Sequence, residues 1–175
     1  MNSKLWDKAV AFHGHECPGL AIGVRACEAS MEKMGIGFSH DEEIVCVTEN
    51  DACGVDAVQA ILSCTIGKGN LIYRGTGKQA FSFFNRRTGE KLRVCLKPKR
   101  KQNMDRARWQ EYLLNAPLDE IFFFSEPKYD PPEKARIFQT IICEICGEGA
   151  SEPKMHLQDG KKVCVDCFED YTRGW

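Results

Sequence analysis

The segments Cys143-Glu144-Ile145-Cys146 and Cys164-Val165-Asp166-Cys167, separated by seventeen residues, decide the fold of the C-terminal part of this chain. Two Cys-x-x-Cys pairs at this separation match the pattern of a zinc site with four thiolate ligands. The two intervening residues let both sulfurs of a pair reach one tetrahedral ion through bonds of about 2.3 Å. We therefore predict a structural zinc ion bound by Cys143, Cys146, Cys164 and Cys167.

The residues around these pairs suggest the rest of the zinc-binding segment. Gly147 permits the positive backbone dihedral of a zinc knuckle, and residues 158–160 suit a hairpin turn. Residues 168–171 can continue as a helix, so the order of knuckle, hairpin and helix resembles a treble-clef zinc finger. Four thiolates complete the zinc shell, so His156 is expected to be a hairpin side chain. The alternative is a pair of unrelated redox Cys-x-x-Cys motifs.

A boundary between two domains is expected just before this segment. Residues 127–134 hold three prolines and four charged residues in eight positions, which is typical of a linker. We predict an α+β core domain over residues 1–130 and a zinc-finger domain over residues 131–175. The second piece is too short to fold on apolar burial alone and needs a metal.

The composition is that of a globular protein, with 43% hydrophobic residues, 28% charged residues and a net charge of −1. This balance gives no reason to expect nucleic-acid binding by the whole chain, and no apolar run is long enough for a membrane helix. Without a signal peptide we expect a cytoplasmic protein, so the ten cysteines indicate metal or thiol chemistry rather than disulfides. Four of them lie in apolar periodic stretches and are expected to be small buried hydrophobes, namely Cys27, Cys46, Cys64 and Cys95.

Hydrophobic periodicity predicts the elements of the first domain. A helix is expected over 18–34, a buried strand over 43–48, and a second helix from Cys53. Three strands then follow as a meander, and a charged helix ends before Pro117. The expected ranges of these later elements are 71–74, 79–84 and 92–96 for the strands and 103–115 for the helix.

Phe12-His13-Gly14-His15-Glu16-Cys17-Pro18-Gly19 places three possible ligands within five residues. In an extended segment, His13, His15 and Cys17 project to one side, and Pro18 favours extended geometry at Cys17. The N-terminus of the following helix should lower the pKa of Cys17 and favour its thiolate.

A second thiol is expected at the start of the next helix. Cys53 follows the strand over 43–48, with Asp51 and Asp56 close by in the sequence. If the two strand-to-helix junctions converge, they form a His/Cys site with room for water. We therefore predict a metal or reactive-thiol site in the first domain.

These motifs resemble the FmdE family, which is named after a component of formylmethanofuran dehydrogenase. The resemblance is carried by residues 12–23, by Asp51-Ala52-Cys53-Gly54-Val55-Asp56 with the residues up to Gln59, and by residues 63–71 with Gly77 and Lys78. The motifs occur in the same order over about residues 6–98, and this is more specific than any one of them alone.

The resemblance implies a thioredoxin-like α+β core with a mixed β-sheet flanked by helices. It also implies an active site that holds zinc, with His15, Cys17 and Cys53 as ligands and water in the fourth place. His13 or Asp56 would then support the ligands from outside the shell. The implied setting is anaerobic one-carbon metabolism beside a molybdenum or tungsten dehydrogenase, and the implied assembly is a homodimer.

The residues leave three functions open. The first is a metal-dependent protein of one-carbon metabolism, either an enzyme or an accessory protein. The second is a thiol redox protein in which Cys17 and Cys53 form a reversible disulfide. The third is a binding module in which the zinc finger and the basic run Lys97–Lys101 contact nucleic acid or a partner protein.

Overall fold

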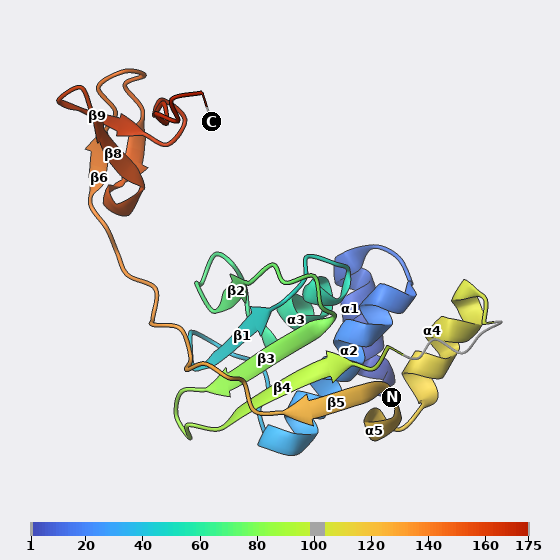
Figure 1. Cartoon of the computed structure of the whole chain (residues 1–175). Helices are drawn as coiled ribbons and strands as arrows, with labels where there is room; N and C mark the ends of the chain where they lie inside the picture. The colour runs from blue at the N-terminus through green and yellow to red at the C-terminus, as the bar shows by residue number, and fades with distance from the viewer. Residues whose placement is uncertain (1, 99–103, 175) are drawn as a thin grey trace. The chain divides into compact units, whose positions relative to one another are not determined.

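The structure is a computed structural model that describes residues 2–98 and 104–174. The chain divides into two compact units, residues 1–135 and residues 136–175. Figure 1 shows the elements of both units. In the first unit they are α1 (Ser3–His13), α2 (Pro18–Met34), β1 (Ile44–Thr48), α3 (Gly54–Leu62), β2 (Leu71–Tyr73), β3 (Ala80–Asn85), β4 (Lys91–Leu96), α4 (Arg106–Asn115), α5 (Leu118–Ile121) and β5 (Phe122–Ser125).

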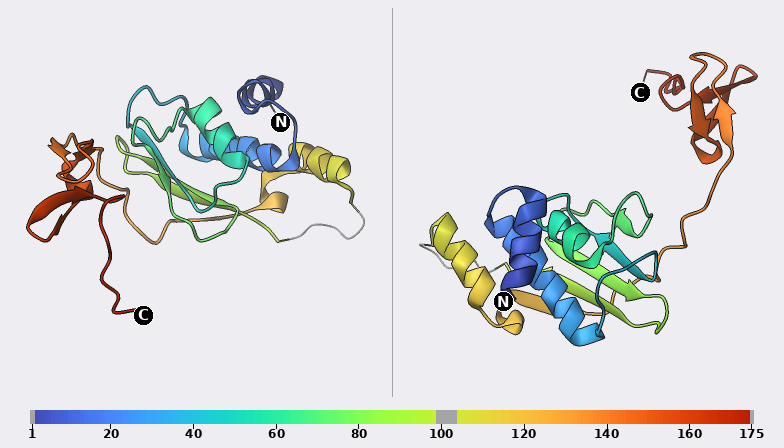
Figure 2. Two further views of the ribbon diagram at one scale, coloured as in Figure 1. Left: turned by 90° about the horizontal axis from the view of Figure 1, so that it is seen from above. Right: turned by 180° about the vertical axis from the view of Figure 1, so that it is seen from behind.

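The first unit is an α+β domain built on a mixed sheet. Its five strands run in the order β2-β1-β3-β4-β5. The β1–β2 pair is parallel, whereas the β1–β3, β3–β4 and β4–β5 pairs are antiparallel. Helices α1, α2 and α3 lie on one side of this sheet (Figure 2), and the main core lies between them and the sheet.

Alternation along β3 shows how the two faces of the sheet are used. Phe81 and Phe83 are fully buried in the main core beneath the helices. Phe84 belongs instead to a smaller cluster with Val45 and Val47, against which Tyr129 packs. Because successive side chains of a strand point to opposite faces, the second cluster covers the face away from the helices.

The predicted helix over 18–34 is confirmed with both ends at the expected residues. Pro18 occupies the first turn, and Gly35 ends the helix in the left-handed conformation at φ 60°. The strand predicted over 43–48 is β1, which is buried at every position. The helix expected from Cys53 begins at Gly54.

The predicted meander is wrong at its first strand. β3 and β4 form the expected hairpin, but β2 pairs with β1 rather than with β3, and Cys46 lies opposite Leu71. A strand that follows β1 and α3 can return parallel to β1 because the helix supplies the crossover. This arrangement places the end of β2 beside the end of β1.

Glycines bring α2 and α3 into close contact. A Cβ on Gly23 would lie 2.2 Å from the carbonyl oxygen of Gly54, and one on Gly19 would lie 3.2 Å from the Cβ of Cys53. The four-residue spacing places Gly19 and Gly23 on one face of α2. This close approach sets the distance between the two junctions that carry Cys17 and Cys53.

The second unit contains two small hairpins. Its elements are β6 (Thr140–Ile142), β7 (Gly149–Ser151), the 3₁₀-helix η1 (Glu152–Lys154), β8 (Met155–Gln158) and β9 (Lys161–Cys164). β6 pairs with β7, and β8 pairs with β9, both antiparallel. Across both units, none of the described helices is long and apolar enough to cross a membrane.

Candidate metal centres

His13 is the last residue of α1, and this decides where its ring points. Asn2 caps the start of the helix, where its side chain accepts the Lys4 N–H, and Gly14 caps the end in the left-handed conformation at φ 91°. The segment is therefore helical up to His13, which corrects the expectation of an extended segment there. Cys17 is extended, at φ −158° and ψ 159°, as expected before Pro18. His13 lies on the last turn of the helix, whereas His15 lies beyond the cap. The two side chains therefore leave the backbone in different directions.

Cys17 caps the N-terminus of α2 with its sulfur. Its Sγ accepts the Leu20 N–H at 3.3 Å, and only 1% of the residue is exposed. Burial by itself would raise the pKa of Cys17, but this hydrogen bond and the contacts with Cys53 and His13 lower it below the ordinary value. The expectation of a lowered pKa is confirmed, and its main source is one amide of the helix N-terminus.

Cys53 comes directly before α3, on the loop that follows β1. Three hydrogen bonds around Asn50 shape this loop. Thr48 Oγ1 donates to Asn50 O at 2.6 Å, Asn50 Nδ2 donates to Lys78 O at 3.0 Å, and Ala52 N–H donates to Asn50 Oδ1 at 3.1 Å. The loop is thus held by buried polar groups, which fixes the position from which Cys53 projects.

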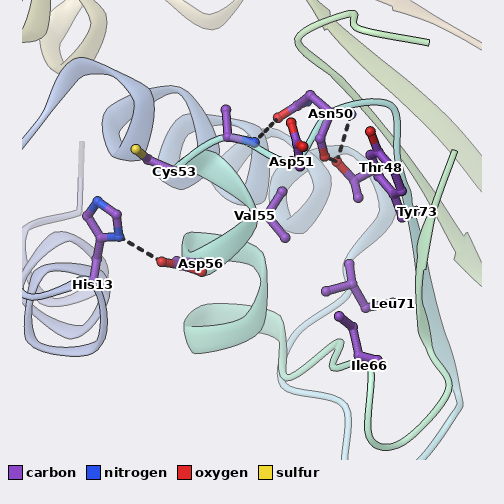
Figure 3. A pocket seen from close by; sticks show the side chains of 11 residues that line it. His13, Thr48, Asn50, Asp51, Cys53, Val55, Asp56, Ile66, Leu71 and Tyr73 are labelled. Atoms are coloured by element: carbon purple, nitrogen blue, oxygen red, sulfur yellow. Dashed lines mark hydrogen bonds and ion pairs between the residues drawn. The ribbon is translucent and has the colours of Figure 1, made fainter. Parts of the chain in front are cut away.

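The structure brings His13, Cys17 and Cys53 together. One donor atom from each residue lies within 4.8 Å of the other two. Asp56, on the first turn of α3, lies 2.7 Å from His13 Nδ1. Because a carboxylate only accepts hydrogen bonds, Nδ1 carries the proton, and His13 Nε2 faces Cys17 Sγ at 3.7 Å. Figure 3 shows the His13–Asp56 contact with Cys53 on the same side.

The histidine in this group differs from the one that the resemblance implied. His15 was the expected ligand, but its side chain is exposed and lies outside the group. Its ring stands 4.3 Å from the ring of His13, centroid to centroid. His13 was expected to support the ligands from outside the shell, and it is the residue placed beside both thiols.

Two thiols and one imidazole form a donor set that suits zinc. Three protein ligands with an open fourth position are typical of catalytic zinc sites. A carboxylate bound to the second nitrogen of the histidine is a common support of such sites, and Asp56 provides one. The hydrogen bond from His13 to Asp56 raises the pKa of His13, whereas burial opposes the rise. Burial and then the neighbouring Cys17 raise the pKa of Cys53.

A cavity of about 490 Å³ adjoins the His13–Cys53 side of this group (Figure 3). Its lining comes from the loop between β1 and α3, from the start of α3, and from β2 with the loop before it. The cavity was not among the features predicted from the sequence. The residues that line it are His13, Thr48, Asn50, Asp51, Ala52, Cys53, Val55, Asp56, Ile66, Leu71 and Tyr73.

The second unit gathers the four cysteines expected to bind zinc. Their sulfur atoms all lie within 4.8 Å of one another, and Cys146 Sγ is 3.9 Å from Cys164 Sγ. Bonds of about 2.3 Å in a tetrahedron place two sulfurs about 3.8 Å apart, which agrees with this distance. Gly147 has φ 79°, so the knuckle that the sequence predicted is present.

Neighbouring groups shift the pKa values of Cys143 and Cys167 in this cluster in opposite directions. Backbone hydrogen bonds, led by the amide of Cys146, lower the pKa of Cys143 to about 6. Contacts with the other sulfurs, led by Cys164, raise the pKa of Cys167 to about 12. Four thiolates this close repel one another unless a cation lies between them, so the cluster is consistent with zinc binding.

One part of the treble-clef prediction is wrong. The hairpin forms, with Asp159 at φ 50° and Gly160 at φ 77° in its two-residue turn, as the Asp-Gly pair favours. However, the stretch after Cys167 contains no helix within residues 168–174. Instead the ring of Phe168 stacks on His156 at 4.1 Å, so His156 is a hairpin side chain as predicted.

The other cysteines fall into two environments. Cys27, Cys46 and Cys64 are fully buried in the main core, which confirms their prediction as small hydrophobes. Burial raises the pKa of Cys64 to about 12, so its thiol stays protonated at neutral pH. Cys95 on β4 is only partly buried. Most of the basic run Lys97–Lys101 lies outside the described residues.

Together these features define a class of protein: an α+β domain with an open thiol–imidazole site, followed by a closed four-cysteine zinc finger. Residues 12–122 match the family described as "FmdE, Molybdenum formylmethanofuran dehydrogenase operon", and residues 136–173 match the prokaryotic dksA/traR C4-type zinc finger. The chain therefore belongs to the FmdE family and carries a C-terminal C4 zinc finger.

Two known proteins are similar to this chain. A protein of Archaeoglobus fulgidus described as a probable S-adenosyl-L-methionine-binding protein is 30% identical over 97% of the chain, which spans about half (54%) of that relative's length. The crystal structure of an FmdE-like protein of the tungsten formylmethanofuran dehydrogenase type, from Syntrophus aciditrophicus, matches with a TM-score of 0.68. It is 24% identical, and the match covers 94% of this chain and 90% of that one. This second likeness supports the fold.

Proposed function

We propose that the chain holds a zinc ion at His13, Cys17 and Cys53, with a fourth position open to water or substrate. It acts as a catalytic or accessory protein of one-carbon metabolism, beside a molybdenum or tungsten dehydrogenase. The observation that carries this proposal is the convergence of three donor atoms from α1, α2 and the loop before α3 within 4.8 Å. A thioredoxin-like core, a homodimer and an anaerobic cytoplasmic setting belong to the same proposal.

The residues around the site have separate roles in this proposal. Asp56 holds the proton on His13 Nδ1, so Nε2 is the nitrogen left for an ion. The Leu20 amide favours the thiolate of Cys17. A zinc ion bound here would supply Lewis acidity, which polarises a carbonyl group or lowers the pKa of a bound water. The adjoining cavity gives a substrate its place beside the ion.

Metal content per chain tests the proposal, measured by elemental analysis on protein purified without oxygen. We expect two zinc ions in the wild type and one in the Cys17→Ala and His13→Ala variants. The matched control His15→Ala should keep both. Loss of one ion in His15→Ala but not in His13→Ala would instead support the ligand set implied by the sequence motif. One ion in the wild type would confine zinc to the finger and defeat the proposal.

Thiol redox chemistry is the second candidate function. It is favoured by the closeness of the Cys17 and Cys53 sulfurs, which lie within 4.8 Å of each other. The pKa of Cys17 is lowered below its ordinary value against the effect of burial, whereas burial and the neighbouring Cys17 raise the pKa of Cys53. One thiolate facing one thiol is the arrangement that disulfide exchange needs. Incubation in glutathione buffers, followed by peptide mapping, tests it. A Cys17–Cys53 disulfide at physiological potentials would support it, and two free thiols under all conditions would reject it.

The Archaeoglobus protein makes S-adenosyl-L-methionine a ligand to test with this chain. The cavity volume of about 490 Å³ is within the range of sites for small organic ligands. Calorimetric titration of the zinc-loaded chain decides the matter. Saturable binding that weakens in Tyr73→Ala would place the ligand in this cavity, and no heat of binding at millimolar ligand would exclude it.

A further inference from the structure

The cavity beside the His13–Cys53 pair has two different ends. Figure 3 shows His13 and Cys53 on one side, and Ile66, Leu71 and Tyr73 on the other, with Val55 between them. Ile66 and Tyr73 are 75% and 59% exposed, although large apolar side chains near a polar site gain by being covered. The cavity therefore offers a ligand an apolar wall that is separate from the thiol–imidazole group.

Most polar groups of the lining already have partners. Thr48 Oγ1 and the Asn50 side chain are used in the loop before Cys53. The Asp56 carboxylate accepts from His13 at 2.7 Å and from Gln59 Nε2 at 3.3 Å. Within the described part of the chain, the Asp51 carboxylate has no hydrogen bond or ion pair. Asp51 is exposed, so its carboxylate is the charged group of the lining that is open to a ligand.

The charges of the lining select against anions. Two carboxylates, Asp51 and Asp56, line the cavity, and no lysine or arginine does so among the described residues. A second cavity, of about 300 Å³, has the opposite balance of charge, although Glu49 and Glu126 also line it. That cavity is lined by four basic side chains, those of Arg74, Lys78, Arg93 and Lys128. Ligands with a net negative charge would therefore be repelled from the first cavity by the negative electrostatic potential of its lining and by the cost of desolvating their charge.

From this arrangement we infer that the first cavity binds a neutral or cationic ligand with an apolar body and a single donor group. The body lies against Val55, Ile66, Leu71 and Tyr73, and the donor group faces the side of the thiol–imidazole group formed by His13 and Cys53. Asp51 attracts a positive charge on the ligand and rejects a negative one. This inference rests on the proposed metal site, and it adds the chemical class of the substrate: an amphiphilic amine, alcohol or carbonyl compound of neutral or positive net charge rather than a phosphorylated or otherwise anionic metabolite. S-adenosyl-L-methionine, whose sulfonium and ammonium groups outweigh its carboxylate, stays within this class.

Three probes on the full-length chain loaded with Co²⁺ test the inference. They are imidazole, 4-phenylimidazole and 4-(imidazol-4-yl)benzoate, which share the donor group and differ in body and charge. Binding is followed by visible absorption, taking the difference between wild type and Cys17→Ala so that the finger cancels. We expect 4-phenylimidazole to bind about thirtyfold more tightly than imidazole because its ring leaves water. 4-(Imidazol-4-yl)benzoate should bind only slightly more tightly than imidazole, because Asp51 repels its carboxylate.

Single variants test the contribution of the apolar wall and that of the Asp51 carboxylate separately. Ile66→Ala and Tyr73→Ala should reduce the advantage of 4-phenylimidazole to a few-fold and leave imidazole unchanged. The matched control Phe123→Ala removes a ring that is 55% exposed on β5, outside the cavity, and should change nothing. Asp51→Asn should restore binding of the benzoate.

The outcomes distinguish the two levels of the proposal. Absence of any cobalt band that depends on Cys17 would overturn the metal site and, with it, the ligand class. A cobalt band with equal affinity for imidazole and 4-phenylimidazole would leave the metal site standing and overturn the apolar subsite. Benzoate binding as tight as that of 4-phenylimidazole would overturn the charge selection.

Discussion

The two cysteine clusters of this chain use thiols in opposite ways. In the finger, four sulfurs from two knuckles form a complete shell within residues 143–167, where little else is buried. In the first unit, two sulfurs and one imidazole from three separate elements stand beside a cavity, on a domain with its own large core. The difference teaches that one metal completes a fold, whereas the other site depends on a fold that already exists.

Removing metal should show this difference most strongly. With a chelator, residues 136–175 are expected to unfold while residues 1–135 stay folded, because a structural zinc ion contributes about 10–16 kcal/mol of apparent binding free energy. Amide NMR spectra with and without chelator measure the effect for each unit. Cys143→Ser should reproduce it, and Cys95→Ser, outside both clusters, should not. A finger with dispersed amide signals after complete zinc loss would contradict the comparison.

A methyl group at Gly23 should lower the stability and the metal binding of the first unit and leave the finger unchanged. Its Cβ would lie 2.2 Å from the carbonyl oxygen of Gly54, so α2 and α3 must separate. We expect Gly23→Ala to lower the free energy of unfolding by about 3 kcal/mol and to weaken metal binding by Cys17 and Cys53. Urea unfolding and elemental analysis measure the two effects.

Gly37 provides the control for this change, since a Cβ there meets nothing within 4 Å. Gly37→Ala should leave both the unfolding curve and the metal content as in the wild type. Wild-type behaviour of Gly23→Ala would show that the helices tolerate a wider spacing than the contact implies.

The free energy of unfolding of the first unit should depend on pH through Glu49, which comes directly after β1 at the start of the loop before Cys53. Arg93 Nε donates to Glu49 at 2.6 Å, and this bond holds the pKa of the buried carboxyl below its usual range, against the effect of burial. A lowered pKa in the folded state means that the stabilisation is present above the unfolded pKa of about 4.3 and is lost as pH falls through the folded value. Glu49→Gln should therefore cost about 2 kcal/mol at pH 7.

Urea unfolding at a series of pH values from 7 to 3 checks this expectation. The difference between Glu49→Gln and the wild type should shrink toward the acid end, and the exposed control Glu32→Gln should show none. A constant difference over the whole range would mean that the charge of Glu49 does not act through its ionisation.

The smallest effect is expected at the turn of the finger hairpin. Gly160 has φ 77°, a conformation that costs other residues about 1 kcal/mol. Gly160→Ala should weaken zinc binding by the finger about fivefold, measured by competition with a chromophoric chelator. Lys161→Ala, in the adjoining strand, is the control. A loss as large as that of a cysteine ligand would mean that the turn, and not only the metal, sets this fold.

Local patterns explain which elements could be predicted. The apolar stripe of α2, Pro18 and Gly35 are all short-range signals, and they placed both ends of the helix correctly. α1 was not predicted, although its signals are present: Asn2 caps it, and Trp6 and Ala9 face the core three residues apart. That omission led to the extended interpretation of the segment at His13, whereas the choice of His15 as a ligand came from the family resemblance.

Other features depend on contacts between distant residues and could not be predicted. β2 pairs with β1 because of the crossover through α3, and no residue within β2 itself specifies this partner. The close contact of α2 and α3 had a weak signal in the Gly19-x-x-x-Gly23 spacing, but its partner Gly54 lies on a separate helix. The cavity combines β2 with the loop before Cys53, so it needed the correct pairing.

By itself, the sequence determined the zinc finger, because its ligands lie in two local knuckles whose spacing matches one ion. It also determined the family and the two thiols of the first site, since both stand at recognisable helix starts. Only the tertiary structure decided which histidine joins those thiols, what lines the cavity beside them and where β2 pairs. These depend on where a helix ends and on how separate elements pack, and such long-range contacts are not encoded in any short stretch of the chain.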